Sequence, residues 1–219
     1  MKPLIGCIIQ ARLTSTRFPK KILADFFGKT VLETVVERCY EAKLVDKIVI
    51  AAPHQLGVCL NEELFIGSEH DVLDRYYQCA KKYGFTVIVR ITSDCPLIEP
   101  YEIDRCINRL LERDTHYVTN RPATFDGNDV EVFTFHALQE AWGHAESLED
   151  REHVTPYMKR DFSLNPISLE APKLSLDTAQ DLERMKAYYE SQRKTYTNHR
   201  RDGEFCSEFP TTYSSVQQA

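Results

Sequence analysis

The chain has 219 residues, of which 42% are hydrophobic and 11% aromatic, and its formal net charge is −6. This length and composition suit one sizeable packed domain and exclude a wholly disordered chain. The acidic charge argues against a nucleic-acid partner, because general nucleic-acid binding normally requires a basic excess. No segment approaches 18 consecutive apolar residues, so we expect neither a membrane span nor a membrane partner.

The cysteines indicate the compartment. None of the seven stands in a C-x-x-C pair, and their number is odd, which argues against a disulfide framework and against a zinc site. We therefore expect buried, reduced thiols in a cytoplasmic protein. The seven are Cys7, Cys39, Cys59, Cys79, Cys95, Cys106 and Cys206.

Apolar runs and helical periodicity alternate along the chain. Residues 4–9 form a short apolar run typical of a buried parallel strand, and residues 30–43 follow with helical spacing. Thr30 and Glu33 predict a capping box at the start of that helix. We expect strands at 4–9, 46–52, 85–91, 116–119, 130–133, 165–169 and 173–176, and helices at 30–43, 68–83, 99–112, 134–145, 149–161 and 178–192.

This alternation predicts an α/β fold with βαβ units and a doubly wound, mostly parallel sheet. Neither an internal repeat nor a low-complexity linker marks a boundary within residues 1–194, which we interpret as one domain. Residues 195–219 are polar and rich in Ser, Thr and Gln, and we expect them to form a C-terminal tail.

A cationic segment follows the first predicted strand. Residues 10–21 (QARLTSTRFPKK) carry four cations and three hydroxyl side chains, with neither G-x-G-x-x-G nor a Walker A sequence. The missing glycines argue against a nicotinamide dehydrogenase and against a P-loop kinase. Ligands of an open parallel sheet bind beyond the carboxyl ends of the strands, and guanidinium groups bind phosphate oxygens in bidentate fashion. The segment therefore predicts a triphosphate-binding loop, with a solvated basic loop as the alternative.

Two aspartates follow predicted strands. Asp94 comes just after residues 85–91, and Asp177 follows a short apolar run and precedes the last helix. Both are expected at the same sheet edge as the cationic loop, where a pair of carboxylates suits Mg²⁺. As alternatives, Asp94 is a turn residue before Pro96, and Asp177 caps the helix that begins at Thr178.

Six segments together resemble one known family. They are IIQARLTSTRFPKKIL (8–23), GSEHDVLDRYY (67–77), RITSDCPLI (90–98), DGNDVEVF (126–133), REHVTPY (151–157) and LDTAQDLERM (176–185). In order and spacing they are similar to the motifs of cytidylyltransferases of the spore-coat polysaccharide type, relatives of the enzymes that make CMP-Kdo and CMP-sialate. The resemblance implies a single Rossmann-like domain of the nucleotide-diphospho-sugar transferase type, with a small excursion for dimerisation or for the acceptor.

The resemblance also implies roles for individual residues. The catalytic group would be Arg12, Arg17, Lys21, Asp94 and Asp177, with CTP as the nucleotide and the two aspartates as ligands of Mg²⁺. The chain is expected to form a homodimer, as relatives of this type commonly do. The nucleotide would contact Gln10, Ala11, Arg12, Ser15, Arg17, Lys21, Ala51, Ala52, Ser68 and Arg75, of which Ser68 and Arg75 flank the cytosine and the alanine backbone reads its amine.

Two features depart from the family pattern. Lys20 stands where the family loop usually has glycine, which changes the local backbone or adds a phosphate contact. Only about 14 residues (53–66) lie between the second strand and Gly67. A helix and a strand that are usual there are therefore expected to be shortened, which would leave the base pocket more open.

The acceptor is expected opposite the triphosphate. We place beside it Asn120, Asp126, Asp129, Glu131, Arg151 and His153. Asp129 and Glu131 lie two apart and share one face of the predicted strand, so they are suited to bind hydroxyl or amine groups. Arg151 is suited to a carboxylate, phosphate or phosphonate. Surface charges and a structural ion pair within residues 149–153 are the alternative.

These features predict a CTP-dependent cytidylyltransferase that joins CMP to a small acidic acceptor and releases pyrophosphate. A sugar acid for surface polysaccharide or glycan synthesis is the preferred acceptor. The reaction would be in-line attack by an acceptor oxygen on the α-phosphorus, catalysed by positioning and charge neutralisation. Two alternatives stay open: the same chemistry on a phosphonate or sugar phosphate, and a non-catalytic nucleotide-binding regulatory protein of the same fold.

Overall fold

One mixed sheet forms the centre of the molecule. The computed structural model describes residues 2–57, 62–113, 115–120, 127–162 and 175–201. Its six-stranded sheet has the order β5-β4-β1-β6-β8-β7. The first four strands of this order run parallel, β8 is antiparallel to β6, and β7 is antiparallel to β8. The prediction of a mostly parallel sheet is therefore confirmed. The strands are β1 Ile5–Gln10, β4 Lys47–Ala52, β5 Glu63–Ile66, β6 Val87–Thr92, β7 Tyr117–Thr119 and β8 Glu131–Thr134.

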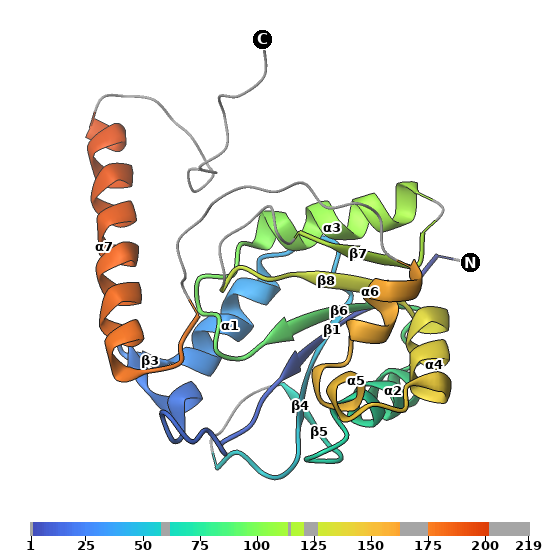
Figure 1. Ribbon diagram of the computed structural model, residues 1–219. Coiled ribbons are helices and arrows are strands. Elements are labelled where there is room, and N and C mark those ends of the chain that lie inside the picture. The colour runs from blue at the N-terminus through green and yellow to red at the C-terminus, as the bar shows by residue number, and fades with distance from the viewer. Residues whose placement is uncertain (1, 58–61, 114, 121–126, 163–174, 202–219) are drawn as a thin grey trace.

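Helices cover both faces of the sheet (Figure 1). Successive side chains of a strand point to opposite faces, so Ile9 packs with the helices on one side and Ile8 with those on the other. The two apolar clusters that result form a helix–sheet–helix sandwich, as expected for a doubly wound sheet. One face carries α1 Val31–Tyr40 and α3 Pro100–Glu112, and the other carries α2 Val72–Tyr83, α4 Phe135–His144, α5 Leu148–His153 and α6 Pro156–Phe162.

Most helices begin where the sequence predicts. The capping box of α1 is present, since Thr30 accepts a hydrogen bond from the Glu33 amide and the Glu33 carboxylate accepts one from the Thr30 amide. The start of α2 differs from the prediction of residue 68. Asp71 is its N-cap, and the Ser68 hydroxyl accepts the Asp71 amide at 2.9 Å, so residues 68–71 form a turn ahead of the helix.

Four short elements were not predicted. A 3-10 turn, η1 Lys21–Leu23, follows the cationic loop and leads into a hairpin of β2 Asp25–Phe26 and β3 Lys29–Thr30. Strand β5 lies inside the segment 53–66, which was expected to have lost much of its structure. Elements of two to four residues carry too little periodicity to be detected from a sequence.

The predicted helix at 149–161 is instead two helices. Val154 adopts φ 71° and ψ −51°, and the Thr155 amide donates to the His153 carbonyl at 2.8 Å, which together make a γ-turn between α5 and α6. Pro156, which has no amide hydrogen and restricts the preceding residue, begins the second helix. The prediction of one helix was wrong because it placed Pro156 in a helix interior, where proline is rarely tolerated.

The last helix, α7, runs from Ala179 to Arg201, beyond the predicted end at residue 192 (Figure 1). Its first turns dock through Leu182 and Met185 onto an apolar cluster with Phe26 of the hairpin. The Tyr189 ring lies 5.1 Å from that of Phe27. The predicted strand at 165–169 and residues 173–174 of the one at 173–176 lie outside the described residues, and residues 175–176 are described but form no strand.

Candidate active site

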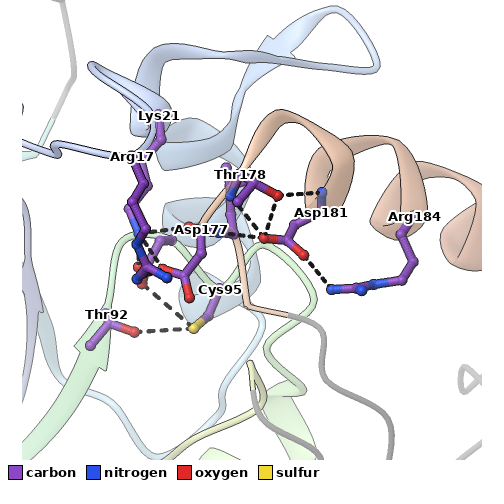
Figure 2. Close-up of polar contacts among 10 residues, drawn as sticks. Arg17, Lys21, Thr92, Cys95, Asp177, Thr178, Asp181 and Arg184 are labelled. Carbon is purple, nitrogen blue, oxygen red and sulfur yellow. Dashed lines mark hydrogen bonds and ion pairs between the residues drawn. The ribbon is translucent and has the colours of Figure 1, made fainter.

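Lys21 is the centre of a cluster of charges at the carboxyl edge of the sheet (Figure 2). Its ammonium nitrogen lies 2.5 Å from Asp94 Oδ2, 2.6 Å from the Leu176 carbonyl oxygen and 3.4 Å from Asp177 Oδ1. The Lys21 side chain is only 12% exposed, so these three acceptors replace most of its hydration. Residues from three distant parts of the chain therefore meet at one cation. The strand-end argument holds for Asp94 after β6 and for the loop after β1, whereas Asp177 reaches the same edge from residues 175–177, which form no strand.

Backbone contacts hold the two aspartates together. The Leu176 amide donates to the Asp94 carbonyl at 3.2 Å, which places the segment before α7 against the turn after β6. The turn itself is closed by backbone, because the Cys95 amide donates to the Thr92 carbonyl. Asp94 is thus a turn residue, as the alternative held, but the turn does not use its carboxylate, which is left to contact Lys21.

The cap of α7 is built by other residues than Asp177. The Thr178 hydroxyl accepts the Asp181 amide at 3.2 Å, and Asp181 Oδ2 accepts the Thr178 amide at 2.8 Å. This reciprocal pair is a capping box with aspartate at its third helical position. Burial alone would raise the pKa of Asp181, but hydrogen bonds from Thr178 and from the Asp177 and Thr178 amides hold that pKa below its usual value. The alternative that Asp177 is the cap is thus wrong.

The other cations of the loop are more exposed than Lys21. Arg17 contacts Asp177 Oδ1 at 3.0 Å with its side chain 66% exposed, and Arg12 lies 3.9 Å from Glu152 with 58% exposed. Ser15 is half-buried in the same loop. Exposed pairs of this kind contribute little stability, so a more highly charged ligand can replace the carboxylates.

Lys20 has an unusual backbone for its residue type. Its φ is 55° and its ψ 27°, the left-handed region that glycine occupies without steric cost. Lys20 therefore adopts a conformation that suits glycine, at the cost of local strain. Among the described residues, no carboxylate pairs with the Lys20 side chain.

The predicted nucleotide side lies across the ends of β1, β4 and β5. Ala51 and Ala52 are buried, and their carbonyls accept the amides of Ala11 and Gly67. Arg75 lies beneath this edge with 2% of its surface exposed and donates to the Ser68 carbonyl at 2.6 Å. Burial lowers the pKa of its guanidinium group. Arg75 therefore stabilises the turn that contains Ser68 by a hydrogen bond from the buried side of that turn.

Two details of this region point to close packing around a ligand edge. A Cβ at Gly67 would lie 2.7 Å from Arg75 Cγ, so only glycine lets the backbone pass over the guanidinium side chain. Gln10, whose neighbours across the sheet are Ala51 and Thr92, has a buried side-chain oxygen without a hydrogen-bond partner in the described part of the chain. An unpaired buried acceptor is costly, which makes a donor group of a ligand its natural complement.

Glu131, predicted to bind the acceptor, is instead a buried structural hub. It accepts hydrogen bonds from Tyr117 at 2.6 Å and from Thr155 at 2.9 Å, and it pairs with Arg90 and Lys159. Burial alone would raise the pKa of Glu131, but these cations and hydrogen bonds lower it to about 2. With 3% of its surface exposed and its oxygens occupied, Glu131 is not placed to contact a substrate.

The remaining predicted acceptor residues differ in their surroundings. Asn120 is buried and holds the Asn128 carbonyl and the Val130 amide, which closes the start of β8 rather than facing a ligand. Arg151 donates to the Ala145 and Trp142 carbonyls and contacts Asp71, a tether between α5, α4 and the start of α2. Asp129 is half-buried and His153 exposed, whereas Asp126 lies outside the described residues.

Comparison with known proteins decides the family. A family model described as cytidylyltransferase matches residues 6–219. The chain belongs to the cytidylyltransferase family. It is therefore a nucleotidyltransferase, which also agrees with its fold. Among the helices of the described residues, none is long and apolar enough to cross a lipid bilayer.

Relatives of this cytidylyltransferase include curated proteins and a solved structure. An uncharacterized protein of Methanocaldococcus jannaschii is 38% identical over 87% of this chain and 83% of its own length. The spore coat polysaccharide biosynthesis protein SpsF of Bacillus subtilis is 31% identical over 84% and 85%. A 3-deoxy-manno-octulosonate cytidylyltransferase of Geobacter sulfurreducens is 39% identical over 49% and 46%. The structure of a cytidylyltransferase from Leptospira borgpetersenii superposes with a TM-score of 0.80 at 26% identity, covering 94% and 100%.

Sequence reasoning missed two contributors to the cluster around Lys21. One is the Leu176 carbonyl, which no side-chain pattern can show. The other is Asp181, which binds the backbone of Asp177 at 3.1 Å. The T-x-x-D spacing of Thr178 and Asp181 was a visible signal for it, because an acceptor three residues after a threonine is the pattern of a capping box.

Proposed function

We propose that this protein transfers CMP from CTP to a small acidic acceptor, with release of pyrophosphate. The acceptor we favour is a sugar acid for surface polysaccharide or glycan synthesis. Family membership and the names of the relatives support this choice. The observation that carries the proposal is the contact of Lys21 with Asp94 and Asp177 directly beside the cationic loop. This arrangement offers both a phosphate-binding cation and a pair of carboxylates at one sheet edge.

Asp94 and Asp177 fit the needs of Mg²⁺. They share one cation partner, so their carboxylates face a common point. In the described residues, no three His, Cys, Asp or Glu side chains form a group that could hold a metal alone. Mg²⁺ typically takes one or two carboxylates and completes its shell with water and phosphate oxygens. When bound, it would neutralise charge on the phosphates of CTP.

The loop cations would carry the rest of the charge neutralisation. Arg12 and Arg17 are exposed cations whose contacts with Glu152 and Asp177 a triphosphate can replace, and Lys21 contacts both aspartates where the loop meets them. In the reaction, an acceptor oxygen forms a bond to the α-phosphorus while the bond to the bridging oxygen breaks and pyrophosphate leaves. A carboxylate, phosphate or phosphonate oxygen arrives ionised, so such an acceptor needs no base.

The pyrimidine is proposed to lie at the ends of β1 and β4. The unpaired oxygen of Gln10 suits the exocyclic amine of cytosine, and the turn at Ser68, supported by Arg75, borders the same edge. A site that hydrogen-bonds a base rejects analogues that leave its polar groups unpaired, so CTP should be strongly preferred over ATP. Comparable kcat/KM values for the two nucleotides would contradict this assignment.

The acceptor is proposed to approach from the α5 side of the loop. Of the residues predicted there, the exposed His153 stays a candidate, and the adjacent Glu152 is near Arg12. A homodimer is also proposed, from the family resemblance. A cytoplasmic location is proposed because the five cysteines of the described residues are buried and form no disulfide. The molar mass in solution, measured by light scattering, tests the dimer.

A pyrophosphate-release screen tests the proposed reaction. The purified chain is supplied with CTP and Mg²⁺ and with Kdo-like acids, nonulosonic acids, alkylphosphonates or sugar phosphates. The proposal expects release with at least one acid, loss of release without Mg²⁺, and a CMP-linked product by mass spectrometry. Activity with only phosphonates or sugar phosphates would show that the acceptor belongs to one of those classes rather than to the sugar acids. No release with any acceptor, together with tight CTP binding, would instead favour the regulatory-protein alternative.

A further inference from the structure

The motif LDTAQDLERM contains an acidic residue that the proposed reaction does not use. Asp181 follows Asp177 by four residues and lies on the first turn of α7, with 8% of its surface exposed. Figure 2 shows its carboxylate turned toward the segment that carries Asp177 rather than toward solvent. A carboxylate this deeply buried needs hydrogen-bond or charged partners that offset the loss of its hydration.

Asp181 binds the backbone on the carboxyl-terminal side of the cluster. Its Oδ2 atom accepts the Asp177 amide at 3.1 Å, the Thr178 amide at 2.8 Å and the Thr178 hydroxyl at 2.9 Å. Its Oδ1 atom pairs with the Arg184 guanidinium group. The two amide bonds fix both peptide units that flank the Asp177 Cα, one on each side.

Leu176, the residue before Asp177, is held as well. The Leu176 amide donates to the Asp94 carbonyl, and the Leu176 carbonyl accepts from Lys21. The backbone of Asp177 is thus held between the turn after β6 and Asp181. An aspartate just before a helix would otherwise be drawn to the amides at the helix start. Here Thr178 and Asp181 form the cap of α7 between them, so the Asp177 carboxylate is not used as a cap and points to Lys21 and Arg17.

We propose that Asp181 is a positioning residue: it directs the Asp177 carboxylate toward the metal site by binding the amides of Asp177 and Thr178, which fixes the backbone on both sides of the Asp177 Cα. This inference rests on the proposed role of Asp177 as a metal ligand. Outer groups that orient a ligand commonly alter metal affinity by about 10- to 100-fold when they are removed. The effect should therefore appear in metal binding itself as well as in turnover.

The test measures Mn²⁺ binding in the presence of CTP, by the relaxation of water protons. Mn²⁺ prefers the same oxygen ligands as Mg²⁺ and is paramagnetic. Asp181→Ala should weaken Mn²⁺ binding by about tenfold or more. Asp181→Asn should retain most of the affinity, because an amide oxygen can still accept the backbone bonds. Glu183→Ala, which removes an exposed carboxylate from the same turn, should have no effect.

Two further variants separate positioning from mere helix stability. Thr178→Ala removes the hydroxyl of the capping box but leaves the Asp177 amide on Asp181, so it should lower Tm and leave Mn²⁺ affinity unchanged. Asp177→Asn should weaken Mn²⁺ binding, and adding Asp181→Ala to it should weaken binding no further.

The outcomes distinguish the two proposals. If Asp177→Asn weakens Mn²⁺ binding and Asp181→Ala does not, the positioning role is refuted while the proposed metal site stands. The positioning role is also refuted if Thr178→Ala weakens Mn²⁺ binding as much as Asp181→Ala. If Asp177→Asn leaves Mn²⁺ binding unchanged, or the wild-type protein binds no Mn²⁺ with CTP, the proposed metal site fails and the positioning role with it.

Discussion

Two adjacent lysines of the same charge provide the sharpest test of the loop geometry. Lys21 is 12% exposed and contacts two carboxylates and a carbonyl, whereas Lys20 is exposed and precedes the turn η1. If Lys21 moves from the aspartates to the phosphates in the transition state, Lys21→Ala removes a charge-assisted contact worth about 2 to 4 kcal/mol. That corresponds to a fall in kcat/KM of about 30- to 1,000-fold. Lys20→Ala should change kcat/KM by less than about threefold, since exposed charges away from the reacting atoms contribute little.

Stability should separate the same two variants. Lys21→Ala leaves Asp94 and Asp177 facing each other without their shared cation, so the free energy of unfolding should fall by about 2 kcal/mol. Added Mg²⁺ should restore part of that loss, and should raise the Tm of this variant more than that of the wild type. Lys20→Ala should stay within about 0.5 kcal/mol of the wild type.

The assays are pyrophosphate release at varied CTP, urea unfolding, and thermal unfolding with and without Mg²⁺. Equal losses of kcat/KM in Lys20→Ala and Lys21→Ala would refute the reasoning, because they would mean that the loop acts only through its net charge. So would a fully active Lys21→Ala, since the contact at the centre of the cluster would then have no part in the reaction.

Three further predictions follow from single residues. Asp94→Asn and Asp177→Asn should each lower kcat by about 100-fold or more while Tm stays nearly unchanged, and the control Asp25→Asn, on the exposed hairpin, should keep its activity. Normal turnover in the Asp94 and Asp177 variants would exclude a metal role. Lys20→Gly should raise the free energy of unfolding in urea by about 0.5 to 1 kcal/mol, because glycine adopts φ 55° without strain, and a loss of stability would contradict this. Glu131→Gln should cost about 3 kcal/mol at pH 7 by leaving the buried Arg90 guanidinium without its carboxylate. The pKa of Glu131 is lowered to about 2 in the folded state, so this stabilisation is fully present above the unfolded pKa of about 4.5. The difference in unfolding free energy between wild type and Glu131→Gln should therefore shrink as pH falls from about 4.5 toward 2. A difference that does not change with pH would contradict this prediction.

The sequence by itself determined the fold class and the three residues at the centre of the candidate site. Buried apolar runs alternating with amphipathic helices require a parallel sheet, and the ends of parallel strands must meet at one edge. Asp94 and the cationic loop follow such strands directly, so their meeting could be predicted from order along the chain alone. Asp177 was placed by the apolar run before it, which was predicted as a strand but forms none at residues 175–176, and by the family resemblance.

Only the tertiary structure decided which polar residues face inward. Glu131 was expected at a substrate, yet its four partners come from β6, β7, α6 and the turn before α6, and no local pattern records such distant contacts. The same holds for Arg75, whose guanidinium lies beneath the turn at Ser68. Whether a charged side chain is buried depends on partners that the fold brings from elsewhere, because burial without them is too costly.

Backbone geometry was the other property that only the fold revealed. The left-handed conformation of Lys20 and the γ-turn at Val154 occur in residues that seldom adopt them, so residue type alone predicts the opposite. Surrounding contacts impose both: Lys20 sits where the loop turns into η1, and Val154 is fully buried beside Thr155, which is bonded to Glu131. Local preference is worth about 1 to 3 kcal/mol at such positions, and the packing of a whole domain can outweigh it.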